Sequence, residues 1–413
     1  MRMKFNKSSQ LVLVSAASLL VASLLTACTQ FTQTLTVDFV FVASSKAAGP
    51  NNYGEIDVYE INSESGRMRQ IPASPFPSAG RNPVAEAVSA DNASLFVVNQ
   101  DDNNIVQFVI GNDGKLYPFN TVNTPGVFPL GIAANASNLF VVDTYQPLPS
   151  CSPAAPCSGS IAVFPLTAAT KTQPVAIGTP VVNPSITASY WPLTLTGSPT
   201  HVVVPTAVNV LATGNYVYVS AYDTSVTPHV GYIFGFSVGN SGVLTPLAGS
   251  PFAAGVLPSS ITSDAAGKFV YVPDYTKGNV LGFSVASGVL TPLAGNPFPA
   301  GNSPSAMVVD PAFPFAYVAN SSDSSVTAYS VSNGALTRLG SYQTGLQPVA
   351  IGIDPSTNHF LYTANFLGNN VTGFQLSQTA GTLLYAQLSP FTSNDQPTAV
   401  AAIPHNGTGA GVH

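Results

Sequence analysis

Two ionisable residues, Glu86 and His201, interrupt otherwise uniform positions of a pattern that repeats along the chain. Histidine exchanges protons near neutral pH, and a positioned carboxyl group can act as a general acid or base. Opening an ester or lactone needs such a proton carrier, together with a group that stabilises the developing oxyanion. Both residues are therefore candidate catalytic groups. The alternatives are that His201 fills space and that Glu86 pairs with Arg81 or is solvated at a strand end.

Three cysteines suggest covalent chemistry of another kind. Cys151 and Cys157 are six residues apart in a Pro- and Ser-rich segment, which predicts a small disulfide loop in an oxidising compartment. Without a nearby His, Asp or Glu, a metal site is the weaker interpretation of this pair. Cys28 follows Leu25-Thr-Ala27, which resembles the cleavage and acylation site of bacterial lipoproteins.

The segment before Cys28 has the pattern of an export signal. A basic start is followed by an apolar run from Leu11 to Leu25, which is too short to span a membrane. We therefore expect a lipoprotein signal peptide at 1–27, a lipid at Cys28 and a tether at 28–38. The expected location is the bacterial cell envelope, at the outer membrane or its periplasmic face.

Composition limits the partners. Charged residues make up only 7% of the chain, its formal charge is −6, and it has no basic cluster, so nucleic acid is excluded as a partner. No phosphate-binding glycine loop, nucleophile elbow or zinc motif is present, which predicts no cofactor and no metal. We expect a monomer.

The candidate residues lie within a repeated four-strand unit. One short aromatic and β-branched run, typical of a strand, recurs seven times, beginning at Phe39, Leu95, Leu139, Tyr216, Phe269, Phe315 and Phe360. A second strand with an aromatic residue at its fifth position follows each, and a third is visible in most units. A further strand precedes the first run in six units and opens with a proline: Pro83, Pro129, Pro199, Pro258, Pro304 and Pro348.

Four strands in about 45 residues, without helical periodicity, predict an all-β, seven-bladed propeller at 39–405, with a tail at 406–413. The first unit lacks its proline-led strand, and a spare one, from Gln396 to Pro404, occurs near the end. We expect this strand to complete the first blade and close the ring, leaving no open edge. Two stretches, 146–159 and 168–197, are longer than the repeat requires and are expected to be surface insertions.

When the seven units are aligned by their opening prolines, His201 and Glu86 each differ from the residues at the same position of the other units. Two places after the opening proline the residues are small except for His201: Ala85, Gly131, His201, Ser260, Ala306, Ala350 and Ala399. Three places after it they are apolar except for Glu86: Glu86, Ile132, Val202, Ile261, Met307, Ile351 and Val400.

The Pro-x-x-Ile and Leu-Tyr-Val-Ala-Asn patterns resemble the YVTN-type repeats of the seven-bladed lactonase family, which includes 6-phosphogluconolactonases. The resemblance covers 39–404 and implies hydrolysis of a sugar lactone in the central channel. The Gly-Pro-Arg-His segment of such enzymes corresponds to Ser198-Pro-Thr-His201, so the histidine is kept and the arginine is Thr200. The Asn-Glu that ends the family's next strand is Ser220-Ala221 here, with no carboxylate until Asp223.

Two functions therefore remain open. One is a lactonase-like hydrolase anchored in the envelope through Cys28. The other is a non-catalytic lipoprotein that binds a glycan or a protein through its loops or channel mouth.

Overall fold

The computed structural model describes residues 37–405 except 63, 171 and 358. The expected signal peptide and Cys28, and all of the tether except its last two residues, lie outside this part, as does the tail at 406–413. Every extended element in the described part is a β-strand, and no helix there is long and apolar enough to cross a membrane.

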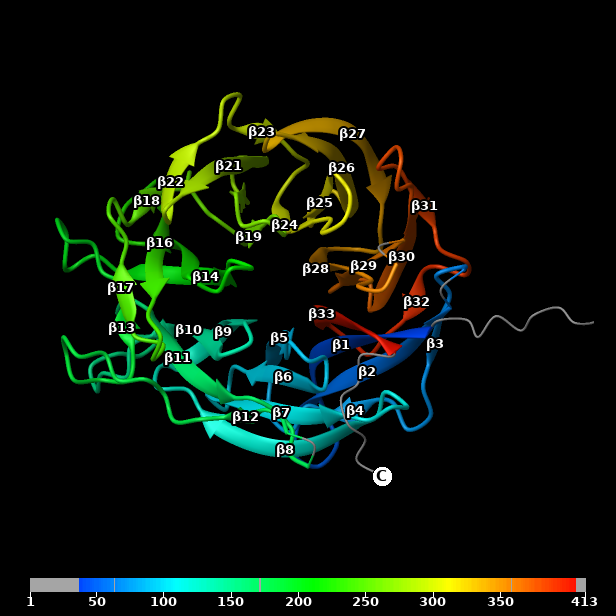
Figure 1. Ribbon diagram of the computed structural model, residues 1–413, viewed down its shortest axis with the longest axis horizontal. Helices are drawn as coiled ribbons and strands as arrows, with labels where there is room; N and C mark the ends of the chain where they lie inside the picture. Colours follow the sequence, from blue (N-terminus) through cyan, green and yellow to red (C-terminus); the bar gives the residue numbers. More distant parts are fainter. Residues whose placement is uncertain (1–36, 63, 171, 358, 406–413) are drawn as a thin grey trace, which may run out of the picture. The chain divides into compact units, whose positions relative to one another are not determined.

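The strands form seven antiparallel sheets of four main strands each, arranged around a ring (Figure 1). The innermost strands are β33 (Pro397–Pro404), β5 (Pro83–Val88), β9 (Val127–Ala134), β14 (Val203–Val210), β19 (Thr262–Ser263), β24 (Pro304–Val309) and β28 (Pro348–Ile353). The second strands are β1 (Val37–Ala48), β6 (Ser94–Asn99), β10 (Asn138–Tyr145), β15 (Tyr216–Asp223), β20 (Phe269–Asp274), β25 (Phe315–Asn320) and β29 (Phe360–Asn365).

The outer half of each blade is built from two further strands. The third strands are β2 (Tyr53–Asn62), β7 (Asn104–Ile110), β11 (Ser160–Thr167), β16 (Val230–Val238), β21 (Asn279–Ala286), β26 (Ser325–Ser332) and β30 (Asn370–Leu376). The outermost strands are β3 (Met68–Gln70), β8 (Leu116–Asn123), β12 (Ala176–Ile177), β17 (Leu244–Pro246), β22 (Val289–Pro292), β27 (Ala335–Gln343) and β31 (Leu383–Tyr385). Blades are numbered first to seventh from β1 onwards.

Ring closure follows the prediction. The last strand, β33, pairs antiparallel with β1, from Asp38 opposite Pro404 to Ser44 opposite Pro397, and supplies the innermost strand of the first blade. Red β33 lies beside blue β1 in Figure 1. The second strands are packed between two neighbouring blades, which explains their nearly continuous apolar sequence: all six residues of β6 are buried.

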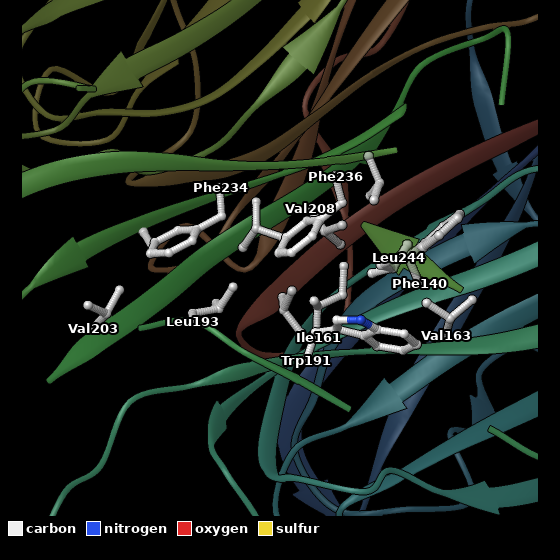
Figure 2. Close-up of a cluster of buried hydrophobic side chains, with 14 residues drawn as sticks. Phe140, Ile161, Val163, Trp191, Leu193, Val203, Val208, Phe234, Phe236 and Leu244 are labelled. Atoms are coloured by element: carbon white, nitrogen blue, oxygen red, sulfur yellow. The ribbon is translucent and has the colours of Figure 1, made fainter. Parts of the chain in front are cut away.

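The long 168–197 stretch is only partly an insertion. It contains β12 and a short strand, β13 (Trp191–Pro192), which pairs with β11. Four other blades have the same short strand, each starting with phenylalanine: β4 (Phe76–Pro77), β18 (Phe252–Ala253), β23 (Phe298–Pro299) and β32 (Phe391–Thr392). Trp191 therefore occupies a repeat position. It is buried between the third and fourth blades with Phe140, Ile161 and Phe236 (Figure 2).

The register predicted for the fourth blade is wrong. The proline of the fourth blade that corresponds to the opening prolines is Pro205, inside β14, and not Pro199. Pro205 pairs with Ala221 and is followed by a bulge before Ala207, just as Pro304 pairs with Asn320 before a bulge at Ala306. The segment Ser198-Pro-Thr-His-Val-Val-Val-Pro205 offers two prolines before valines, and the sequence pattern alone selected the first.

The corrected register changes which residues of the fourth blade stand two and three places after the opening proline, the positions at which His201 and Glu86 were exceptions. Ala207 now fills the small position, so that position is small in all seven blades. At Gly131 the reason is visible, because an added Cβ would lie 3.0 Å from Val142 Cγ2 and 3.5 Å from the Cα of Ala207 in the next inner strand. Val208 fills the apolar position, where Glu86 remains the exception. His201 precedes the inner strand by two residues and is not part of it.

Candidate functional site

One face of the ring carries the loops that lead into the inner strands and the hairpins that join second to third strands. We call it the inlet face. In five blades, the glycine three residues before the opening proline packs against the Asn or Asp near the end of the second strand: Gly80–Asn99, Gly126–Asp143, Gly255–Asp274, Gly301–Asn320 and Gly345–Asn365. The Gly126 and Gly301 amides donate to Asp143 (3.2 Å) and Asn320 (3.0 Å). This contact fixes the loop that enters each inner strand.

The fourth blade lacks this contact. The corrected register places Val202 and Ala221 at the two positions, and neither side chain can form it. Instead, β14 and β15 continue for two more residues beyond Pro205 and Ala221, up to the pair Val203–Asp223. His201 lies directly before this extension, and Asp223 ends it. The fourth blade thus differs at its inlet end from the five blades with the glycine contact. The first blade also lacks that glycine, and the third has a similar extension, up to the pair Val127–Tyr145.

His201 and Asp223 form a close pair in this extension. The imidazole Nδ1 lies 2.6 Å from Asp223 Oδ2. The Asp223 side chain is only 2% exposed and the His201 side chain is 32% exposed. The second carboxylate oxygen, Oδ1, accepts the backbone N–H of Ser225 at 2.8 Å. A buried acceptor therefore holds one nitrogen of a solvent-accessible imidazole.

This arrangement suits general acid–base chemistry. A carboxylate that accepts the Nδ1 proton fixes the tautomer in which Nε2 is unprotonated, and it stabilises the imidazolium formed when Nε2 takes up a proton. Nε2 can then remove a proton from water. The sequence indicated His201 but not its partner, because the register error hid that Asp223 lies across from Val203. The sequence signal that could have revealed the pair is the spacing between the loop that carries His201 and the end of the strand that carries Asp223.

Two pairs of aromatic rings lie on the inlet face of the third and fourth blades, close to the His201–Asp223 pair in sequence or topology. The ring of Tyr222, the neighbour of Asp223, lies 5.3 Å from the ring of His229, centroid to centroid. In the third blade, Phe128 and Tyr145 are 6.2 Å apart, edge to face. All four rings are half-buried and therefore partly accessible. Such rings can stack against the apolar face of a sugar.

Glu86 is remote from this pair in the fold. It projects from β5 of the second blade, and the expected pairing with Arg81 is wrong, because Arg81 Nε donates to Asp102 at 2.7 Å. Nor is Glu86 solvated: both carboxylate oxygens are buried, without a hydrogen-bond partner of good geometry among the described residues. Burial raises the pKa of Glu86 to about 8, against a small lowering by the backbone amide of Ala401 on β33. Glu86 is thus a neutral group between the first two inner strands at neutral pH.

The other predicted covalent site is present. Cys151 and Cys157 form a disulfide, with their Cα atoms 5.4 Å apart, in the loop between β10 and β11 of the third blade. Within the described residues, no group of three His, Cys, Asp or Glu side chains could hold a metal ion.

The fold and the repeat pattern define a seven-bladed β-propeller. The model of a family described as "Lactonase, 7-bladed beta-propeller" matches residues 288–401, which confirms the resemblance inferred from the repeats.

Solved structures show the same fold over most of the chain. A putative 6-phosphogluconolactonase from Bacteroides fragilis is 21% identical, covers 90% of this chain and 99% of its own, and has a TM-score of 0.67. The periplasmic gluconolactonase PpgL of Pseudomonas aeruginosa is 18% identical, covers 89% and 99%, and has a TM-score of 0.66. At these identities the likeness establishes the fold alone. A search of curated proteins gave no match.

Proposed function

We propose that this chain is an envelope-anchored hydrolase that opens a sugar lactone at the inlet face, over the third and fourth blades. The observation that carries the proposal is the His201–Asp223 pair, in which a buried carboxylate orients an accessible imidazole. His201 would act as general base toward a water molecule that attacks the lactone carbonyl, and would then return the proton to the leaving ring oxygen. Anchoring through Cys28 is part of the same proposal.

The charges of the chain favour an uncharged lactone over a phosphorylated one. Four cationic side chains are neutralised by carboxylates close by, in the pairs Lys46–Asp395, Arg69–Glu60, Arg81–Asp102 and Lys115–Asp113. Among the ion pairs of the described residues, none brings a Lys or Arg to His201 or Asp223. A phosphate ester would need such a group. The aromatic rings near the pair offer apolar surface to a neutral sugar instead.

The test is hydrolysis by the soluble domain of glucono-δ-lactone and of its 6-phosphate, followed by proton release in weak buffer. We expect turnover of the neutral lactone, a smaller kcat/KM for the phosphate ester, and a fall of kcat by about a hundredfold or more in His201→Gln. The control is His359→Gln, which changes a histidine between β28 and β29 of the seventh blade and keeps both the pair and the aromatic rings. Equal loss in both variants, or no turnover of any lactone by the wild-type protein, would contradict the proposal.

A second function rests on the same geometry. The His201–Asp223 pair lies beside the positions at which five other blades use glycine and Asn or Asp to fix the loop, so it can serve to hold this loop in place. The aromatic rings would then form a glycan-binding surface of a non-catalytic lipoprotein. This function predicts that sugars perturb the fluorescence or NMR signals of Tyr222 and Tyr145, and that the sugars themselves are not chemically changed.

A further inference from the structure

The disulfide loop of the third blade reaches the segment that carries His201. The loop extends from the end of β10 to the start of β11, and its base is closed by a hydrogen bond from the Gln146 amide to the Ser158 carbonyl, at 3.1 Å. Four further backbone bonds follow inside the loop: from Leu148 to Gln146 and from Cys151 to Leu148, both at 2.9 Å, and a reciprocal pair between Ser152 and Ala155. Ser158, next to Cys157, is the residue at which the loop rejoins the blade.

The Ser158 hydroxyl forms hydrogen bonds on both sides of Val202, the residue that follows His201. Its hydroxyl donates to the His201 carbonyl oxygen at 3.0 Å and accepts the Val203 amide at 3.0 Å. Ser158 is only 6% exposed, so water does not compete easily for these two hydrogen bonds. The third blade thus bonds to the His201 carbonyl through one hydroxyl group, while the neighbouring Gly159 amide donates to the Val203 carbonyl at 2.8 Å.

The fourth blade holds the same segment from its other side. The Val202 amide donates to Ser225 Oγ at 2.8 Å, and the Thr224 amide donates to the Val202 carbonyl at 2.9 Å. The backbone next to the His201 ring is therefore held from two blades. Removing the Ser158 hydroxyl leaves the fourth-blade contacts and the Gly159–Val203 bond, but it frees the carbonyl of His201 itself.

Packing contributes little to holding the disulfide loop. Residues 147–150 and 153–156 are exposed, and the remaining loop residues before Ser158 are at least partly accessible except Gln146. For such a loop, a covalent link that closes six residues restricts the conformations available to its end. On its loop side, Ser158 is therefore held by the disulfide and the Gln146 bond, whereas Gly159 on its other side is fixed by backbone hydrogen bonds to Val203 and Leu193.

We propose that Ser158 is a positioning residue for His201 and that the Cys151–Cys157 disulfide keeps Ser158 in place, so that reduction of the disulfide loosens the His201–Asp223 pair. A dithiol reductant would transfer two electrons and two protons. The S–S bond breaks, two cysteine thiols form, and the reductant becomes its own disulfide. The effect on catalysis rests on the proposed function, whereas the effect on the pair does not.

The pair can be observed directly by NMR. A proton held between His201 Nδ1 and a buried carboxylate gives a resonance far downfield of the amide protons, and its loss in His201→Gln assigns it. We expect this proton to exchange with water about tenfold faster in Ser158→Ala, and in the wild-type protein after dithiothreitol, because the His201 carbonyl and the Val203 amide lose their bonds to the Ser158 hydroxyl. Ser152→Ala is the matched control, since Ser152 lies in the same loop and its hydroxyl, among the described residues, accepts a hydrogen bond from the Ala155 amide alone.

Reduction of the wild-type protein needs no substitution, so the test remains decisive even if Ser158→Ala folds poorly. Unchanged exchange after complete reduction, or equal effects of Ser158→Ala and Ser152→Ala, would overturn the proposal, as would absence of the resonance from the oxidised protein. A wild-type protein that shows the predicted NMR response but hydrolyses no lactone would remove the proposed function and leave the positioning role of Ser158 intact.

Discussion

Glu86 predicts an unusual dependence of stability on pH. Burial raises its pKa from 4.5 to about 8 in the folded ring, whereas the unfolded chain has the ordinary value. Between these two values the folded protein retains a proton that the unfolded chain has lost. The free energy of unfolding therefore falls as the pH rises from 4.5 to 8 and is constant with respect to this group outside that window.

The size of the effect follows from the shift. Each pKa unit corresponds to about 1.4 kcal/mol, so a shift of roughly 3.5 units sets an upper limit of about 5 kcal/mol. Glu86→Gln replaces a neutral carboxylic acid by a neutral amide of the same size. We expect its stability to match the wild-type protein at pH 4 and to exceed it by about 2–5 kcal/mol at pH 8.5, because only the wild-type group must then ionise without a partner.

Urea unfolding at several pH values, followed by tyrosine and tryptophan fluorescence, measures this difference. Asp38 and Asp143, whose pKa values burial raises to about 7, tilt the profile in the same direction in both proteins and cancel in the comparison. Glu60→Gln is the surface control, since Glu60 pairs with Arg69 on the outer part of the first blade, and should change stability by less than about 1 kcal/mol. A Glu86→Gln protein whose stability runs parallel to the wild-type profile from pH 4 to 8.5 would refute the reasoning.

Three further predictions concern the ring and its anchor. Deleting residues 396–413 removes β33, exposes the edge of β1 and should lower the melting temperature by more than about 10 °C; a truncated protein that melts with the full-length one would exclude closure by this strand. The Tyr218 hydroxyl donates to the Gly288 carbonyl of the next blade at 2.7 Å, whereas the buried Tyr362 hydroxyl has no partner among the described residues. Tyr218→Phe should therefore cost about 1–2 kcal/mol in urea unfolding and Tyr362→Phe nothing, and equal losses would contradict the assignment. Cys28→Ala should abolish labelling by a radioactive fatty acid in cells, and a mutant that is still labelled would place the lipid elsewhere.

The number of blades and their closure could be predicted because they depend on repetition. Each second strand is buried between two neighbours, so its apolar run is nearly unbroken and recognisable in every unit. The spare strand before Pro404 was informative because a ring with one missing and one surplus strand has a single simple solution. The disulfide was equally local, since six residues leave Cys151 and Cys157 within reach of each other.

The site was harder to predict because it lies where the repeat changes. Pro199 and Pro205 both precede valines, and alignment by the first of them placed His201 in the inner strand, whereas Pro205 is the proline that pairs with the second strand. The partner of His201 then had no assigned position. Likewise, Glu86 was expected to pair with Arg81 because the two are close in sequence. Arg81 instead lies in the loop before β5, where Asp102 from the next hairpin accepts its backbone and side-chain N–H groups.

The central claim is that Asp223 holds His201 as a base for opening a neutral lactone. Asp223→Asn tests it most directly, because the amide keeps the size of the side chain and can still accept the Ser225 amide while losing the negative charge. Hydrolysis of glucono-δ-lactone by the wild-type and variant proteins should be compared at pH 6–9, with the melting temperature measured alongside. The account predicts a kcat lower by at least about a hundredfold at an unchanged melting temperature. A variant as active as the wild-type protein would contradict it.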